Sequence, residues 1–148
     1  MRLKPNTLIV VAGPTASGKT ALAIKIAKAV DGEIVSADSM QIYRGVDIAT
    51  AKPTPEELAA VPHHLIGFLP MDRAFSVADY AELARKEIND ILSRGKVPVL
   101  CGGTGLYIKA IVDNVQYSEA ITGDEALRER LRQLAEREGN DALWRRLE

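Results

Sequence analysis

The fold of this chain is decided by one stretch, Gly13-Pro14-Thr15-Ala16-Ser17-Gly18-Lys19-Thr20, which fits the phosphate-binding pattern G-x-x-x-x-G-K-[ST]. An apolar, β-branched run at 8–12 precedes it, as a buried strand requires, and 21–30 carries apolar residues at helical spacing. In this order of strand, loop and helix, glycines let backbone amides converge on an anion at the helix N-terminus. Lys19 adds a full positive charge, and the hydroxyl of Thr20 can bind magnesium. The stretch therefore predicts a site for a phosphorylated ligand with Mg²⁺.

The rest of the chain alternates predicted strands and helices. We expect strands at 33–37, 63–68 and 97–101, and helices over 54–62, 76–94 and 106–112. This alternation predicts a three-layer α/β fold of the P-loop NTPase-like type, a parallel sheet with helices on both faces. Gly32 is expected to supply the left-handed residue that ends the first helix. Pro98 lacks an N–H donor, so its strand is expected to start at an edge of the ladder there.

Composition is that of a soluble globular protein, with 148 residues, 47% hydrophobic and 26% charged. The net charge of −1 gives no global basic field for nucleic acid, although a local patch would suffice. Cys101 is the only cysteine, which excludes an internal disulfide and fits a reducing, cytoplasmic setting. No apolar run approaches the length of a membrane-spanning helix, so we expect no membrane partner.

Two polar residues follow predicted strands at the edge of the sheet that faces the loop. Asp38 comes after the second strand and could orient magnesium or act as a general base, or it could only cap its own turn. Thr104 is the one hydroxyl in a second glycine loop, 102–105, and could contact the ligand. Alternatively, the loop is only a tight turn, and its glycines supply positive φ. The adjacent His63 and His64 point to opposite faces of a strand, which favours packing roles over a metal site.

The phosphate loop alone leaves the reaction open. Most such loops bind nucleoside triphosphates, so an ATP-dependent kinase for a nucleoside or another small molecule is the default expectation. The fourth strand, however, ends in Cys101-Gly102-Gly103 rather than in an acidic magnesium ligand. Asp38 is then the only acidic residue at a strand end in the predicted crevice.

Five blocks, taken together and in this order, resemble the bacterial tRNA dimethylallyltransferase family. They are Gly-Pro-Thr-Ala-Ser-Gly-Lys-Thr at 13–20, Ser-Ala-Asp-Ser-Met-Gln-Ile-Tyr-Arg-Gly at 36–45, Thr-Ala-Lys-Pro at 50–53, Pro-His-His-Leu at 62–65 and Gly-Gly-Thr-Gly-Leu-Tyr at 102–107. The resemblance covers the chain almost from end to end. It implies that the phosphate loop holds a pyrophosphate ester rather than ATP.

The resemblance also implies roles for individual residues. Residues 15–20 would hold the pyrophosphate of dimethylallyl diphosphate, with Thr20 near Mg²⁺. Asp38 would accept a proton from the exocyclic amine of an adenine beside the anticodon, in the anticodon stem-loop of tRNA. The adenine and its neighbours would contact Ser39, Met40 and Gln41, and Thr104 would bond near the reacting centre. Arg128 matches an arginine that contacts tRNA in the family.

The resemblance also sets expectations about domains, since members of that family run to about twice the present length of 148 residues. We expect 1–118 to be an incomplete P-loop-type core that lacks its last strand, and 119–148 to begin a helical tRNA-binding insertion. That insertion would open with a capping box at Thr122 and break at Gly139. We expect the chain alone to have weak or no transferase activity. For full-length members of the family, the resemblance favours a monomer.

Overall fold

The computed structural model describes residues 3–46, 52–117 and 125–146 of the 148-residue chain. The chain forms two compact units, Met1–Gln116 and Tyr117–Glu148. The first unit holds, in chain order, β1 (Ile9–Ala12), α1 (Lys19–Val30), β2 (Gly32–Ser36), α2 (Pro55–Ala60), β3 (His63–His64), α3 (Val77–Ser93), β4 (Val97–Gly102) and α4 (Gly105–Val112).

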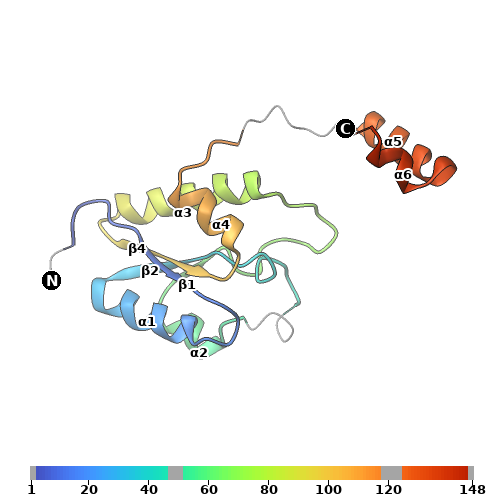
Figure 1. The fold of residues 1–148 in the computed structure, drawn as a ribbon. Helices are drawn as coiled ribbons and strands as arrows, with labels where there is room; N and C mark the ends of the chain where they lie inside the picture. The colour runs from blue at the N-terminus through green and yellow to red at the C-terminus, as the bar shows by residue number, and fades with distance from the viewer. Residues whose placement is uncertain (1–2, 47–51, 118–124, 147–148) are drawn as a thin grey trace. The chain divides into compact units, whose positions relative to one another are not determined.

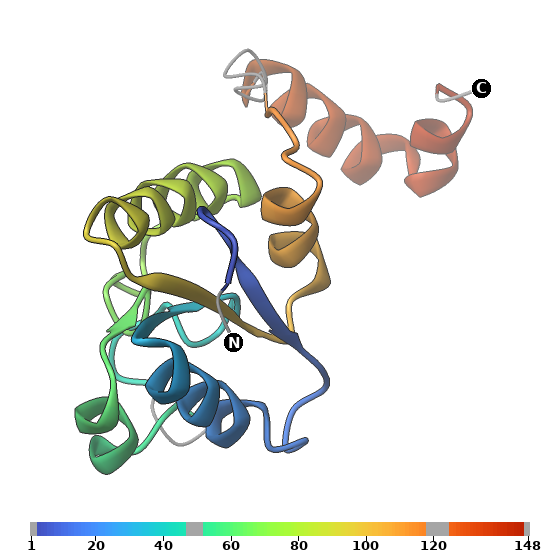
Figure 2. The same cartoon turned by 90° about the vertical axis from the view of Figure 1, so that its left-hand side faces the viewer.

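The first unit is a parallel sheet between two layers of helices, which confirms the predicted fold class. The strands lie in the order β1-β4-β2-β3, and every pair is parallel. In Figures 1 and 2, α1 and α2 cover one face of the sheet, and α3 and α4 cover the other. All five residues of β2 are buried, as expected of a strand in a parallel sheet that helices cover on both faces.

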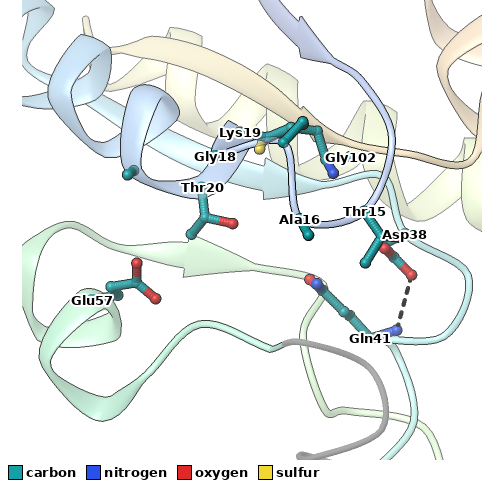
Figure 3. A pocket seen from close by; sticks show the side chains of 12 residues that line it. Thr15, Ala16, Gly18, Lys19, Thr20, Asp38, Gln41, Glu57 and Gly102 are labelled. Carbon is teal, nitrogen blue, oxygen red and sulfur yellow. Dashed lines mark hydrogen bonds between the residues drawn. The ribbon is translucent and has the colours of Figure 1, made fainter.

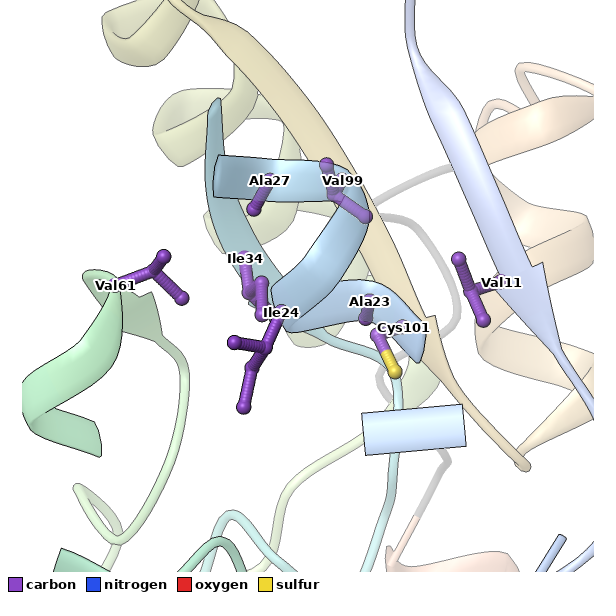
Figure 4. Close-up of a cluster of buried hydrophobic side chains, with 8 residues drawn as sticks. All are labelled: Val11, Ala23, Ile24, Ala27, Ile34, Val61, Val99 and Cys101. Carbon is purple, nitrogen blue, oxygen red and sulfur yellow. The ribbon is translucent and has the colours of Figure 1, made fainter. Parts of the chain in front are cut away.

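Alternate residues of each strand supply two separate cores. Ile34 and Val99, which are register partners, face α1 and form one cluster with Ala23 and Ala27 of that helix (Figure 4). The residues one position further along β2 and β4 pack instead against α3 and α4, in a second cluster with Tyr80 and Tyr107. The alternation of strand side chains is the physical reason that one sheet can hold helices on both sides.

The expectation for Pro98 was wrong in placing it at an edge, because β4 lies between β1 and β2. The ladder between β4 and β1 begins only at Val99. The carbonyl of Cys101 accepts the N–H of Ala37 on the β2 side. Since successive residues direct their backbone groups to opposite sides, the nitrogen of Pro98 points to the β1 side, before that ladder starts. The missing donor therefore costs no hydrogen bond within an interior strand.

Two boundary predictions are also corrected. Asp31, not Gly32, is the left-handed residue after α1, with φ of 51°, whereas Gly32 already opens β2. A Cβ on Gly32 would lie 2.5 Å from the carbonyl oxygen of Val97, so the glycine permits close packing of strands. The strand predicted at 63–68 ends at His64, because Leu65 and Gly67 both take positive φ.

The second unit contains α5 (Glu125–Glu138) and α6 (Asn140–Trp144). The predicted break at Gly139 is confirmed, since Gly139 takes a φ of 80° between the two helices. The predicted capping residue Thr122 lies outside the described residues, as do Thr50 and Ala51. None of the helices described here is long and apolar enough to span a bilayer.

Candidate phosphate-binding site

The loop between β1 and α1 has the geometry that its sequence predicts. Two of its residues, Ala16 and Gly18, take positive φ values of 62° and 80°, which turn the backbone into the first turn of α1. Helix α1 then begins at Lys19, so its free N-terminal amides lie at the end of the loop. The ammonium of Lys19 donates to the carbonyl oxygen of Pro14 at 2.7 Å and closes the loop on itself.

This loop forms one wall of a pocket of about 350 Å³ (Figure 3). Residues from the segments after β2 and β4 and from α2 form the rest. The lining residues are Thr15, Ala16, Ser17, Gly18, Lys19, Thr20, Ala21, Asp38, Gln41, Glu57, Cys101 and Gly102.

Most of the predicted site residues of the first unit lie in this pocket or next to it. Gly13 and Pro14 precede the lining part of the loop, and Ser39 and Met40 lie between Asp38 and Gln41. Arg128 lies in α5, which belongs to the second unit.

Sequence reasoning missed Glu57 as a pocket residue. Thr54 and Glu57 form the capping box that starts α2. The Glu57 carboxylate nevertheless lines the pocket, on the far side of Thr20 from Asp38 (Figure 3). No sequence signal separates a capping carboxylate that faces solvent from one that faces a ligand site.

Asp38 caps its own turn and also lines the pocket. Its Oδ1 accepts the N–H of Met40 at 2.9 Å and that of Gln41 at 3.3 Å, so the carboxylate caps its own turn. It also lines the phosphate pocket. Among the residues that the structure describes, the hydrogen bonds of Asp38 use Oδ1, so Oδ2 keeps its capacity to accept a hydrogen bond.

Thr104 connects the glycine loop after β4 to the segment that carries Asp38. Its Oγ1 accepts the N–H of Ser39 at 2.9 Å and donates to the Ser39 hydroxyl at 3.2 Å. Its own N–H donates to the carbonyl oxygen of Ala37 at 3.1 Å. Thr104 thus holds the Asp38 segment in place rather than lining the pocket itself.

The glycines beside Thr104 do not serve to supply positive φ, because Gly102, Gly103 and Gly105 all have ordinary φ values. Gly102 permits close approach instead, since a Cβ there would lie 2.1 Å from the carbonyl oxygen of Ala37. This contact brings the end of β4 against the segment that follows β2.

Cys101 is a structural residue of the pocket wall. Burial raises the pKa of the Cys101 thiol. The positive charge of Lys19 lowers this pKa, and the negative charge of Asp38 raises it. A neutral thiol at pH 7 is a poor nucleophile. Lys19 and Asp38 line the same pocket as Cys101.

The two histidines make structural contacts. Nδ1 of His63 bonds to the carbonyl oxygen of Val61 at 2.8 Å, and burial lowers the pKa of this histidine. His64 bridges two carboxylates, with Nε2 at 2.8 Å from Glu33 and Nδ1 at 2.9 Å from Glu87.

The donors of the pocket fit a magnesium ion. Mg²⁺ prefers oxygen ligands and usually takes only one or two protein groups beside phosphate oxygens and water. The hydroxyl of Thr20 and the carboxylates of Asp38 and Glu57 are such donors and line one pocket. No cluster of three or more histidine, cysteine or acidic side chains, as in a metal cage built by protein alone, occurs among residues 3–46, 52–117 and 125–146.

A parallel sheet whose first strand leads through a G-x-x-x-x-G-K-T loop into a helix defines a P-loop α/β protein. The family model described as IPP transferase matches residues 41–148. The chain belongs to the IPP transferase family.

Individual relatives agree with this assignment. A tRNA dimethylallyltransferase from Exiguobacterium is 53% identical over 145 residues, which are 98% of this chain and 46% of the relative. The crystal structure of a full-length tRNA isopentenylpyrophosphate transferase from Bacillus halodurans matches with a TM-score of 0.75 and 44% identity, over 96% of this chain and 46% of that one. A eukaryotic dimethylallyltransferase acting on tRNA matches with a TM-score of 0.72 and 31% identity, over 76% of this chain and 28% of that one. The chain therefore spans about half the length of the bacterial relatives, or less.

Proposed function

We propose that this chain takes part in transferring a dimethylallyl group from dimethylallyl diphosphate to the exocyclic amine of an adenine next to the tRNA anticodon. The observation that carries the proposal is the placement of Asp38 in the same pocket as Lys19 and Thr20. A leaving-group cradle and a proton acceptor are the two groups that this alkylation needs. Relatives named tRNA dimethylallyltransferase support the choice of substrates over those of a kinase.

In the proposed reaction, the residues on each wall of the pocket have a distinct role. The amine nitrogen of adenine bonds to the terminal allylic carbon, and the bond between that carbon and the diphosphate oxygen breaks. Loop amides and the ammonium of Lys19 stabilise the charge that develops on the departing pyrophosphate. The proton of the amine passes to Asp38, whose Oδ1 is already occupied by its turn and whose Oδ2 is the acceptor. Magnesium, held by Thr20 with Glu57, would supply further charge neutralisation at the pyrophosphate.

The adenine would reach this pocket from a single-stranded loop. A base in the anticodon loop leaves its stack at a cost of only a few kcal/mol. Ser39, Met40 and Gln41 would contact that base and its neighbours, because they directly follow Asp38. Arg128 in α5 would contact the tRNA backbone. The lone, buried thiol of Cys101 fits a reducing, cytoplasmic location.

Competition binding tests the proposal on the 148-residue chain. With Mg²⁺ present, we expect calorimetry to show binding of dimethylallyl diphosphate at least tenfold tighter than that of ATP. Lys19→Ala should abolish the binding. Asp38→Asn should leave it within about threefold, since an asparagine oxygen can accept the same turn bonds. Tighter binding of ATP than of dimethylallyl diphosphate would contradict the transferase proposal and support the kinase.

A turnover assay completes the test. Because the chain spans about half of its relatives, we expect slow or no prenyl transfer to an anticodon stem-loop by this chain alone. Any transfer that is measured should be lost in Asp38→Asn. Full multiple-turnover transfer by the 148-residue chain would contradict the first expectation, and an active Asp38→Asn variant would contradict the role of Asp38 as the base.

A further inference from the structure

Tyr80 is a buried hydrogen-bond donor directed at the end of strand β2. The residue lies in α3 and is 0% exposed. Its hydroxyl donates to the carbonyl oxygen of Ser36, the last residue of β2, at 2.9 Å. Burial raises the pKa of Tyr80, with a smaller effect from Tyr107, so the hydroxyl keeps its proton at neutral pH.

The bond from Tyr80 acts where the chain leaves the sheet and enters the site. Next in sequence, the N–H of Ala37 donates to Cys101 at 2.8 Å and its carbonyl accepts from Thr104 at 3.1 Å. Asp38 follows directly. The backbone immediately before Asp38 is therefore held from three directions, by α3, by β4 and by the loop before α4.

The ring of Tyr80 makes a second connection, to the helix that follows Thr104. It stacks on the ring of Tyr107, with centroids 3.9 Å apart and an interplanar angle of 7°. Tyr107 lies in the first turn of α4, and its N–H donates to the carbonyl oxygen of Thr104 at 3.0 Å. The stacked pair thus joins the strand that carries Asp38 to the helix that begins at Thr104.

Packing alone does not require a hydroxyl at this position. A phenylalanine would fill nearly the same volume and stack on Tyr107 equally well. Burying a hydroxyl is unfavourable unless it forms a hydrogen bond, and the Tyr80 hydroxyl forms one with the carbonyl oxygen of Ser36. The sequence therefore places a donor where the core needed only an aromatic ring.

We propose that Tyr80 is a positioning residue of the site, whose hydroxyl fixes the segment 36–41 and thereby the carboxylate of Asp38. The inference rests on the proposed function only for the role of Asp38 as the base. Because a general base must lie within hydrogen-bond distance of the proton it accepts, small displacements of this segment reduce turnover.

Amide hydrogen exchange measured by NMR tests the proposal without any ligand. Three amides report on the segment: that of Ser39, which donates to Thr104, and those of Met40 and Gln41, which donate to Asp38. In Tyr80→Phe we expect all three to exchange about tenfold faster, since local opening no longer breaks the tyrosine bond. Ile91→Val is the control, because Ile91 is buried in the same helix and its truncation lowers global stability without touching Ser36.

In Ile91→Val the three amides should stay within about twofold of the wild type, since they exchange by local opening. Unchanged exchange in Tyr80→Phe, or equal acceleration in both variants, would overturn the proposal. If Tyr80→Phe does not fold, Tyr107→Leu takes its place. This variant keeps the Tyr80 hydroxyl and removes only the stacked ring, so the three amides should stay within about threefold of the wild type; a tenfold acceleration would overturn the assignment to the hydroxyl.

A binding arm separates this inference from the proposed function. Calorimetry with Mg²⁺ and dimethylallyl diphosphate should give affinities for Tyr80→Phe within about threefold of the wild type, because the phosphate loop is untouched. Failure of the wild type to bind counts against the proposed function, whereas the exchange rates alone decide the role of Tyr80.

Discussion

Gly102 is the residue at which β4 comes closest to the segment that follows β2. A Cβ there would lie 2.1 Å from the carbonyl oxygen of Ala37, so Gly102→Ala must displace backbone at the edge of the pocket. We expect this variant to lose about 3 kcal/mol or more of unfolding free energy in urea denaturation.

Gly105 provides the matched control for that variant. It opens α4, three residues further along the same loop, and a Cβ there meets nothing within 4 Å. Gly105→Ala should therefore be neutral or stabilising, by up to about 1 kcal/mol. Equal destabilisation in the two variants would show that close approach is not what requires glycine at position 102.

Glu33 is a buried carboxylate at the opposite end of β2 from the pocket, and it is 3% exposed. The pKa of Glu33 falls from the ordinary 4.5 to about 2. The largest cause is the bidentate hydrogen bonding by the Arg94 guanidinium; burial opposes it, and hydrogen bonds from His64 and Lys96 lower the pKa further. A depressed pKa in the folded state adds stability that is complete above about pH 4.5 and is lost as the pH falls toward 2.

This linkage predicts how stability depends on pH. The unfolding free energy should drop by up to about 3 kcal/mol between pH 5 and pH 2 through this one group. Glu33→Gln should be destabilised by a similar amount at pH 7, and the gap from the wild type should narrow steadily at pH 4 and pH 3. Urea denaturation at each pH measures the gap, and a constant gap would contradict the linkage.

At the scale of the element, α3 shows how local signals fix a helix that serves the site. The Ser76 hydroxyl oxygen accepts the N–H of Asp79 at 3.2 Å, and the Asp79 carboxylate in turn accepts the N–H of Ser76 at 2.8 Å. The same contacts with Ser76 lower the pKa of Asp79. Gly95, with φ of 75°, follows the other end of the helix.

Loss of the N-terminal cap should therefore destabilise the first unit. We expect Ser76→Ala to lower the unfolding free energy by about 1 kcal/mol. Ser93→Ala, at the last residue of α3, removes a hydroxyl that bonds only to the carbonyl oxygen of Asp90 in its own helix, and should change it by less than about 0.5 kcal/mol. Thermal denaturation of the two variants side by side distinguishes a capping effect from a general effect of losing a hydroxyl.

At the scale of the whole molecule, the division into two units leads to a further prediction. Every residue that lines the phosphate pocket lies before position 117. A chain that ends at Gln116 should therefore bind Mg²⁺ and dimethylallyl diphosphate with an affinity within about threefold of that of the 148-residue chain. Calorimetry on both chains checks this, and loss of binding in the shorter chain would mean that the second unit contributes to the pocket.

Much of the fold could be predicted from local sequence, since the capping boxes at Thr54 and Ser76 and the phosphate loop each depend on residues a few positions apart. The errors at Pro98 and Gly32 have a different origin. Whether a proline can lie in an interior strand depends on where the neighbouring ladder begins, and whether a glycine turns the chain or admits a neighbour depends on what packs against it. Both are properties of distant residues that no local pattern contains.

Spacing along single segments predicts the phosphate loop, the alternation of strands and helices, and Asp38 as an acidic residue at a strand end. Only the tertiary structure decided that Glu57 joins the pocket, that Thr104 holds Ser39, and that Tyr80 supports the strand before Asp38. These contacts join residues up to 65 positions apart. They exist because parallel pairing brings the carboxyl ends of β2 and β4 to one edge of the sheet. Hydrophobic burial on both faces of the sheet stabilises this arrangement.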